Sequence, residues 1–442
     1  MTEVITILEH QVLPIVAKRN PGECAITRNE ADKLGAIKSL PGNACSWQHN
    51  KIKWSQFCGV VCIGGLTLEI LPKIHGKEND PRSCRSVLVR MLRASGFMKL
   101  HKMGAASLEL QKYTVLDIFI QDLCEQLEKE LLQGKIRKYI THEENLPVLR
   151  GKLLSGYQLR HNLAHKERLY CQFDELSEDI PVNQVIKLAL GILVPLARNK
   201  FVKNLLVRML YAFDGVSDID IKTARNKDIA FNRNEERYAS IYGACQQVIQ
   251  SLYQDVVTGK EQSFSLLFDM NKLFEKWVAS ILKPMARKSS LSIREQGPQK
   301  NLVRRQNIGE LFQLQPDISL VENGRVVLIA DAKWKLLDGK ESKLGIAQSD
   351  LYQMRAYASR YGVTRLVLFY PAQAEIEGVY DMEYLDGGSA GSSGNYDNSD
   401  NLLLRVITVD IDGGVSKDTG KAGDIAQKVM GLLTPAESQF PV

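Results

Sequence analysis

Two aspartates and a lysine stand on a short apolar stretch in the last third of the chain. The segment "QPDISLVENGRVVLIADAKWK", residues 315–335, has two apolar runs joined by Asn323-Gly324, which predicts a β-hairpin. Asp317 begins the first predicted strand, and Asp331 and Lys333 lie near the end of the second. Residues two apart on a strand point to the same face, so Asp331 and Lys333 are predicted to share one.

The turn of this hairpin decides whether Asp317 joins them. A two-residue loop at Asn323-Gly324 pairs Asp317 with Ala330 and sends Asp331 to the opposite face. A three-residue loop that includes Glu322 sets Asp317 opposite Ile329, and all three side chains then share a face. A functional site therefore predicts the odd loop or an equivalent β-bulge.

Two carboxylates on one face indicate metal-dependent hydrolysis of a phosphodiester. With the backbone carbonyl of Ala332, Asp317 and Asp331 can hold one or two Mg²⁺ ions, and Mn²⁺ is an alternative. The ion activates water and neutralises charge on the phosphate, while Lys333 orients the water or stabilises the developing oxyanion. From spacing alone a second interpretation stays open: Asp331 and Lys333 form an ion pair at a strand end, and Asp317 caps a turn.

The residue types that are missing from this part of the chain narrow the chemistry. No histidine follows His165 and no cysteine follows Cys245. The last third of the chain therefore offers neither a zinc site of the usual His/Cys kind nor a histidine general base. A metal there would be a hard ion held by oxygen.

The chain as a whole has the composition of a globular protein large enough for two or three domains. It has 442 residues, 44% of them hydrophobic and 24% charged, without an apolar run long enough to span a membrane. Its eight cysteines form no CxxC pair, and the amino terminus does not resemble an export signal. We therefore expect reduced thiols, a cytoplasmic location and no membrane partner. The net charge of +6 permits a nucleic-acid partner without requiring one.

The hydrophobic pattern predicts a multidomain α/β protein with three parts. Residues 1–95 form a β-rich domain, with a strand pair around Gly64-Gly65, and residues 96–260 form a mainly helical domain with a few strands. Residues 261–442 form an α/β domain with a mixed sheet, in which a helix starts near residue 262 and a mobile Gly/Ser-rich insertion lies near 385–401. Helices are predicted at 116–134, 183–200, 236–253 and 349–362, and strands at 168–176, 365–371 and 401–411.

A basic segment precedes the hairpin and faces a single acid, Glu295. Its cations are Lys283, Arg287, Lys288, Arg294, Lys300, Arg304 and Arg305. Such a run is either a solvated surface or a contact for phosphates, and its place next to the two aspartates makes it our candidate DNA-binding segment.

"PDISLV…IADAKWK" resembles the PD-(D/E)xK nuclease signature. Gln353 and Tyr357 in "YQMRAY" match the helix motif of its RecB-like branch, and "MNKLFEKWV" resembles the first helix of that branch, where a glutamate, here Glu275, joins the metal site. The resemblance implies catalytic roles for Asp317, Asp331, Lys333, Glu275, Gln353 and Tyr357. Taken singly, the three helical residues could also be ordinary surface.

The wider resemblance is to the McrC family, the nuclease subunits of McrBC modification-dependent restriction systems. It is carried by "LEILPKI", "LVRML", "LPVLRGKLL", "QLRHN" and "FDELSEDIPVNQVIKLAL", followed by the nuclease block. It implies an Mg²⁺-dependent endonuclease of antiviral defence that cuts double-stranded DNA. It also implies a partner, a hexameric ring of McrB-like AAA+ GTPase subunits, on which residues 1–95 dock and whose GTPase they stimulate.

This chain itself is expected to bind no nucleotide. "GGVSKDTGKAG" is one residue too long for a phosphate-binding loop and lacks Ser or Thr after Lys421. Double-strand cutting needs two active sites, so two such subunits are expected to pair. Two further functions stay open, a catalytically silent adaptor that only activates the ring and a stand-alone RecB-like nuclease.

Overall fold

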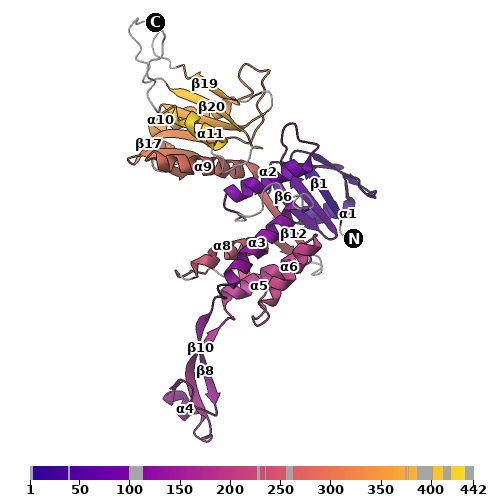
Figure 1. Cartoon of the computed structure of the whole chain (residues 1–442), viewed down its shortest axis with the longest axis vertical. Helices are drawn as coiled ribbons and strands as arrows, with labels where there is room; N and C mark the ends of the chain where they lie inside the picture. Colours follow the sequence, from indigo (N-terminus) through magenta and orange to yellow (C-terminus); the bar gives the residue numbers. More distant parts are fainter. Residues whose placement is uncertain are drawn as a thin grey trace.

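A computed structural model describes residues 3–37, 40–98, 113–225, 229–233, 235–254, 262–373, 376, 378–385, 402–411 and 420–433. The molecule has the predicted mixed α/β structure. It is elongated, with an α/β unit at one end, sheets and helices in the middle, and a narrow arm at the other end (Figure 1). The predicted insertion near 385–401 lies outside the described residues, apart from Leu385. Among the described residues, no helix has the length and apolarity needed to cross a bilayer.

A five-stranded sheet forms the centre of the amino-terminal region. Its order is β1-β7-β6-β12-β11, with β1 and β7 parallel and the other neighbours antiparallel. Every residue of β6 and β7 is buried, and the two strands turn at Gly64-Gly65 as predicted. The strands are β1 (Glu3–Leu8), β6 (Phe57–Ile63), β7 (Leu66–Leu71), β11 (Leu252–Gln254) and β12 (Gln262–Asp269).

The predicted helix start near residue 262 is wrong, because residues 262–269 form strand β12. Its pairing also does not follow the predicted domain boundary at 261. It pairs with β6, so a segment assigned to the carboxyl-terminal part completes the amino-terminal sheet. Serine and large apolar residues alternate from Ser263 to Leu266, which fits a strand, and the helix begins only at Met270, capped by Asp269. The pairing depends on Gly59, because a β-carbon there would lie 2.1 Å from the carbonyl oxygen of Leu266.

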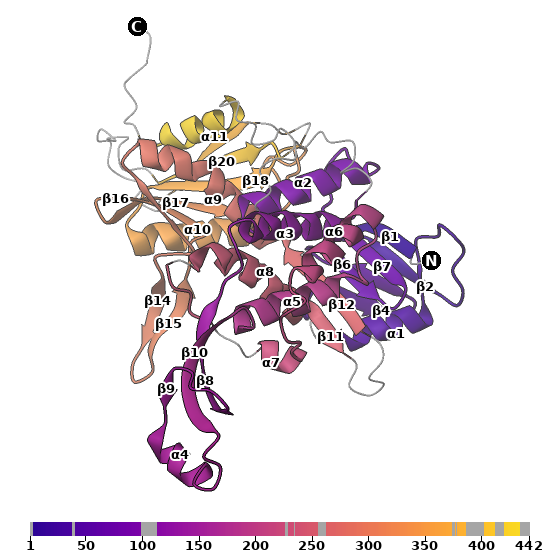
Figure 2. The ribbon, with the colours of Figure 1, turned by 60° about the horizontal axis from the view of Figure 1, so that its bottom comes forward.

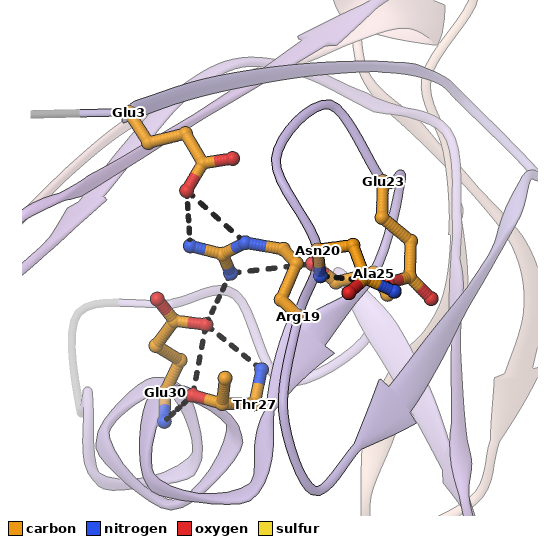
Figure 3. Close-up of polar contacts among 7 residues, drawn as sticks. All are labelled: Glu3, Arg19, Asn20, Glu23, Ala25, Thr27 and Glu30. Atoms are coloured by element: carbon orange, nitrogen blue, oxygen red, sulfur yellow. Dashed lines mark hydrogen bonds and ion pairs between the residues drawn. The ribbon is translucent and has the colours of Figure 1, made fainter.

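A smaller sheet, of order β3-β2-β5-β4, and helix α1 flank the first sheet. Arg19 ties them together, because its guanidinium lies 2.6 Å from Glu3 on β1 and 2.5 Å from Glu30 on α1 (Figure 3). Thr27 and Glu30 form a capping box that starts the helix. The elements are β2 (Val12–Val16), β3 (Ile26–Thr27), α1 (Arg28–Ala36), β4 (Cys45–Gln48) and β5 (Lys51–Trp54).

Helices fill the middle of the molecule, as predicted. Thr114 caps α3, whose apolar face packs against α6 and α8, and α5 packs against the same two helices. One continuous apolar core runs from Cys58 of the first sheet through these helices to Val367 of the carboxyl-terminal sheet. The helices are α2 (Pro81–Ala94), α3 (Val115–Leu131), α5 (Pro181–Leu193), α6 (Lys200–Tyr211), α7 (Ile221–Arg225) and α8 (Ala239–Ser251).

An arm projects from the helical region, away from both other parts (Figures 1 and 2). It consists of β8 (Lys138–Leu146), β9 (Lys152–Leu153), α4 (Ser155–His161) and β10 (Leu169–Ser177), and β10 is the strand predicted at 168–176. Large apolar side chains are exposed along it, at Tyr139, Val148, Leu149, Leu159 and Leu163.

The carboxyl-terminal unit is a six-stranded mixed sheet with helices on both faces. Its order is β13-β16-β17-β18-β20-β19, and only β17-β18 and β18-β20 are parallel. Helices α9 and α11 cover one face and α10 covers the other. The elements are α9 (Met270–Lys288), β13 (Ser292–Glu295), β16 (Ile318–Glu322), β17 (Arg325–Ala332), α10 (Gln348–Tyr361), β18 (Arg365–Pro371), β19 (Val379–Glu383), β20 (Leu403–Val409) and α11 (Gly420–Met430).

A two-stranded ribbon of β14 (Lys300–Arg305) and β15 (Gly309–Leu314) extends from this sheet (Figure 2). In the sequence, the ribbon lies between β13 and β16. The mixed sheet and the predicted order strand, strand, helix, strand are confirmed as β16, β17, α10 and β18. The neighbouring strands β13 and β19 were not predicted.

Candidate functional site

A β-bulge brings the two aspartates of the hairpin together. The turn is the two-residue loop, since Glu322 pairs with Arg325 and Val321 with Val326. The register then shifts by one residue, so that Leu320 pairs with Leu328 and Ile318 with Ala330. Continued by one residue on each strand, this register sets Asp317 across from Asp331. The prediction that a shared face requires an odd loop or an equivalent bulge is confirmed in its second form.

Asp331 starts a chain of polar contacts that ends on helix α10. Its carboxylate is 1% exposed, and Lys333 Nζ lies 2.5 Å from its Oδ2. Lys333 also donates to Gln353 Oε1 at 3.1 Å, and Gln353 Nε2 lies 2.8 Å from the Tyr357 hydroxyl. The 4-residue spacing of Gln353 and Tyr357 places both on one face of α10. The predicted residues of the hairpin and of this helix therefore meet in one network.

The hydroxyl of Tyr357 closes the network on the hairpin. It donates to the backbone carbonyl of Gln315 at 3.1 Å, two residues before Asp317. Burial raises the pKa of Tyr357, so the hydroxyl stays protonated. Burial also disfavours the charge of Lys333, but the neighbouring carboxylate of Asp331 outweighs it and raises the pKa of the ammonium group. Lys333 is therefore a fixed cation at this position.

Asp317 and Glu275 form the other side of the site. The Ala332 backbone N–H donates to Asp317 Oδ2 at 3.0 Å, which fixes this carboxylate against the end of β17. Gln296 Nε2 lies 2.7 Å from Glu275 Oε2 and 3.3 Å from Asp317 Oδ1, so one amide bridges the two acids. Glu275 comes from α9 and the aspartates from the hairpin, and this brings the predicted residues of three elements together.

The carboxylates carry more negative charge than their neighbours offset. Burial, with the charges of Asp331 and Glu275, raises the pKa of Asp317 to about 8. Burial, with the charge of Asp331, raises the pKa of Glu275 to about 7. The buried Oδ2 of Asp331 accepts no well-aligned hydrogen bond from the described residues, although Lys333 lies beside it. Such a cluster has room for an additional positive charge.

The donor set fits a hard divalent cation, although the side chains alone do not form a complete cage. Among the residues that the structure describes, no three His, Cys, Asp or Glu side chains are close enough to hold an ion by themselves. Asp317 and Asp331 lie on the same face of neighbouring strands, and the amide of Gln296 links Glu275 to Asp317. An Mg²⁺ ion accepts one or two protein carboxylates and completes its shell with water and phosphate oxygens.

The predicted basic segment does not form a single loop. Lys283, Arg287 and Lys288 lie on the last turns of α9, Arg294 lies on β13, and Lys300, Arg304 and Arg305 lie on the ribbon. Lys283 forms an ion pair with Glu295, and Arg304 lies 2.7 Å from Glu310. Lys300 donates to the Arg360 carbonyl at 3.3 Å and stacks over Tyr361.

Two glutamines of the site, Gln296 and Gln315, were not predicted from the sequence. Gln296 bridges Glu275 and Asp317, and it lies in a left-handed conformation (φ 53°) just after β13. Gln315 Nε2 donates to Gln296 Oε1 at 2.7 Å and so orients the bridging amide. The two residues flank the ribbon. The one signal in the sequence was their position, directly before Gly297-Pro298 and Pro316.

Comparisons with known proteins connect this geometry with a family. A chain of the half-complex from a tetradecameric assembly of Thermococcus gammatolerans McrB AAA+ hexamers with bound McrC shares the fold, with a TM-score of 0.70 and 18% identity. The match covers 98% of this chain and 100% of that one. A chain of the Thermococcus gammatolerans McrBC complex matches with a TM-score of 0.49 and 21% identity, over 63% of this chain and 87% of that one.

No curated protein matches the chain. The family model described as "McrBC 5-methylcytosine restriction system component" matches residues 52–371, from strand β5 of the smaller sheet through the hairpin to the end of β18. That range is well over half of the sequence, so the chain belongs to the McrBC 5-methylcytosine restriction system component family.

Proposed function

We propose that this protein is the DNA-cutting subunit of a McrBC-like restriction system, an Mg²⁺-dependent endonuclease. The observation that carries the proposal is the β-bulge that sets Asp317 across from Asp331, with Lys333 fixed beside them. A hairpin that only formed a structural ion pair would need neither the register shift nor the polar network to Gln353 and Tyr357.

Asp317 and Asp331 are the residues that would hold the metal, with Glu275 and the backbone carbonyl of Ala332 completing the donor set. Bound there, the ion would lower the pKa of a water molecule and neutralise charge on the scissile phosphate. Lys333 would place its ammonium group against the phosphate oxygen on which negative charge develops. Gln353 holds Lys333 Nζ at 3.1 Å, and Tyr357 holds Gln353, so the cation is oriented before substrate arrives.

Double-stranded DNA would approach along the side of the site where the ribbon and the end of α9 carry cations. Gln296, an exposed member of the site, lies at the base of the ribbon, so the ribbon rises directly beside the carboxylates. Arg294 and Arg305 are exposed there, and we propose that they contact phosphates. Arg304 is held by Glu310 and would contribute less.

The proposed partner is a ring of AAA+ GTPase subunits, because a solved relative of the same fold is described as bound to McrB AAA+ hexamers. Residues 1–95 are our predicted docking region. The arm offers a second surface, since it projects away from the rest of the chain and exposes large apolar side chains (Figure 1). Replacing Leu159 and Leu163 by aspartate tests the arm, and loss of co-purification with the GTPase is the result expected if the arm docks.

The test of the proposed reaction is Asp331→Asn, which removes a charge without changing the size of the side chain. We expect cleavage of modified DNA to fall by at least about 10³-fold, because the metal and the orientation of Lys333 both depend on this carboxylate. Stimulation of the partner GTPase should be retained. A matched control is Asp338→Asn, in the loop after Lys335, which should cut normally. If the Asp331 variant cuts like the wild type, the assignment is wrong and the silent adaptor is the better function.

A further inference from the structure

A glutamate of the amino-terminal region contacts the candidate site from outside the carboxyl-terminal unit. Glu9 directly follows β1, and its Oε1 accepts a hydrogen bond from Trp334 Nε1 at 2.8 Å. Trp334 is the residue after Lys333, and 325 positions separate the two partners in the sequence. The bond therefore joins the residue after the first strand to the residue after the lysine of the proposed nuclease motif.

Trp334 connects Glu9 to both sides of the site. Along the backbone it adjoins Lys333, whose N–H donates to the Phe369 carbonyl at 2.9 Å and extends the ladder between β17 and β18. The ring of Trp334 packs edge-on against that of Phe274, with the ring centroids 5.4 Å apart. Phe274 adjoins Glu275 on α9. A shift of the indole would thus reach the backbone next to Lys333 and the helix that carries Glu275.

Packing alone does not fix the position of Trp334. Trp334 is half-buried and lines an open pocket of about 310 Å³ between the amino-terminal and carboxyl-terminal parts, together with Glu9, His10, Lys73 and Ile411. A half-buried side chain at an open pocket has fewer contacts to hold it in place than a close-packed residue. The hydrogen bond to Glu9 is therefore the directional restraint on the indole.

Glu9 itself is rigidly placed. It is 2% exposed, its N–H donates to the Leu71 carbonyl at 2.8 Å, and its Oε1 accepts a second bond from the Lys73 N–H at 2.9 Å. Its Oε2 has no hydrogen-bond partner among the described residues, and His10 Nε2 lies 3.9 Å away. A buried acid with only one oxygen in use is costly to maintain, which argues for a role beyond the stability of β1.

We infer that Glu9 is a positioning residue for the proposed phosphodiester cleavage, acting through Trp334 on Lys333 and Glu275. The inference rests on the proposed nuclease function. It makes the amino-terminal sheet part of the catalytic apparatus, so that any displacement of this sheet would alter the geometry of a site that it does not itself line.

The test compares Glu9→Leu with Glu9→Gln in the full-length chain together with its partner GTPase. Leucine fills the buried space without an acceptor, whereas glutamine keeps an oxygen for Trp334 and Lys73. We expect Glu9→Leu to lower kcat on the order of 10- to 100-fold with little change in KM for DNA, and Glu9→Gln to stay within about threefold of wild type. Trp334→Phe keeps the ring and removes the donor, and combining it with Glu9→Leu should add no further loss.

Hydrogen exchange gives a readout that does not depend on cleavage. In Glu9→Leu, the backbone amides of 270–280 and 329–337 should exchange faster than in wild type, while in Glu9→Gln they should not. His75→Asn is the matched control, because His75 is exposed at the same pocket and forms no hydrogen bond or ion pair with Glu9 or Trp334 among the described residues, and it should leave exchange and cleavage unchanged.

The outcomes separate this inference from the proposed function. Unchanged exchange and unchanged kcat in Glu9→Leu overturn the positioning role, and so does an equal loss in the leucine and glutamine variants. If exchange responds as expected but even the wild-type protein does not cut DNA, the nuclease proposal fails and the structural link from Glu9 to the site stands.

Discussion

The carboxylate of Glu69 and those of Asp317 and Asp331 are surrounded in opposite ways. Glu69 on β7 is fully buried, and Arg85 on α2 contacts both of its oxygens, at 2.9 and 2.6 Å. The Val115 N–H and the Thr6 hydroxyl donate to it as well, both at 2.9 Å. Among the described residues, Asp317 accepts hydrogen bonds from the Ala332 N–H and, at 3.3 Å, from Gln296 alone.

The difference distinguishes an acid whose partners are all in the protein from the acids that we propose to be functional. At Glu69 every oxygen is satisfied by donors of the protein, and the cation of Arg85 balances the charge. At the candidate site the described residues form a single ion pair, between Lys333 and Asp331, and burial together with repulsion among the acids raises the pKa of Asp317 and Glu275. Such a surplus of negative charge is costly unless a cation binds there. Substitutions at Glu69 and its partner Arg85, and at Asp317, test the two kinds of environment separately.

The largest effect is expected at the structural pair. Arg85→Met removes the cation and leaves Glu69 buried without its main partner, which should lower the free energy of unfolding by about 3–5 kcal/mol. Thermal unfolding followed by circular dichroism measures it. The double replacement Glu69→Leu/Arg85→Met should recover much of the loss, because no unpaired charge then remains. If Arg85→Met unfolds at the wild-type temperature, Glu69 is not held as the structure indicates.

The candidate site should respond in the opposite direction. Asp317→Asn removes one of the repelling charges, so at about pH 8 and without metal the melting temperature should rise by roughly 2–4 °C. Cleavage should be lost in the same variant. A gain in stability together with a loss of activity is the expected mark of a functional acid. A fall in melting temperature would instead make Asp317 a structural residue, like Glu69.

Local sequence patterns predicted some parts of the structure, and contacts between distant segments were not predicted. Periodic segments such as α3, α10 and the β6-β7 pair follow from local patterns, and the shared face of Asp317 and Asp331 followed once a bulge was allowed. Pairings between distant segments did not. Strand β12 joins β6 because Gly59 permits a close approach, which no local periodicity records.

Site residues that lie in loops were also not predicted from the sequence. Gln296 and Gln315 bridge and orient the acids from positions without a repeating pattern. Glu9 reaches Trp334 across almost the whole length of the chain. The residues that we propose carry the chemistry lie in recognisable motifs, whereas those that contact and orient them are identified by their positions in the folded structure.

Without metal, the stability of the wild-type protein should depend on pH through Asp317 and Glu275. Their pKa values in the folded protein, about 8 and about 7, lie above the ordinary values of 3.8 and 4.5, so the folded state binds more protons in this range. Stability is therefore expected to fall as pH rises from about 4 to about 8. Asp317→Asn should show a weaker dependence. Melting temperatures across this pH range measure both.

Magnesium should reverse that trend, because the ion competes with protons for the same oxygens. Saturating Mg²⁺ is expected to raise the melting temperature clearly at about pH 8.5 and little at about pH 5.5. Asp331→Asn should abolish the gain at high pH. Ca²⁺, which prefers the same ligands but more of them, serves as a comparison. An equal Mg²⁺ effect at both pH values would mean that the ion binds elsewhere.

The smallest effect is expected at the bridging amide. Gln296→Ala removes the donor shared by Glu275 and Asp317 but none of the charges, so both acids keep their positions on α9 and the hairpin. Cleavage should fall only several-fold, and the Mg²⁺ concentration for half-maximal cleavage should rise by a similar factor, because the acids are then less well oriented. Gln299→Ala, near the same end of the ribbon but bonded only to Gln313 among the described residues, should cut normally. A loss at Gln296 as large as that at Asp331 would show that the amide contacts the reacting groups directly. Gln296 would then be a catalytic residue and not a positioning residue.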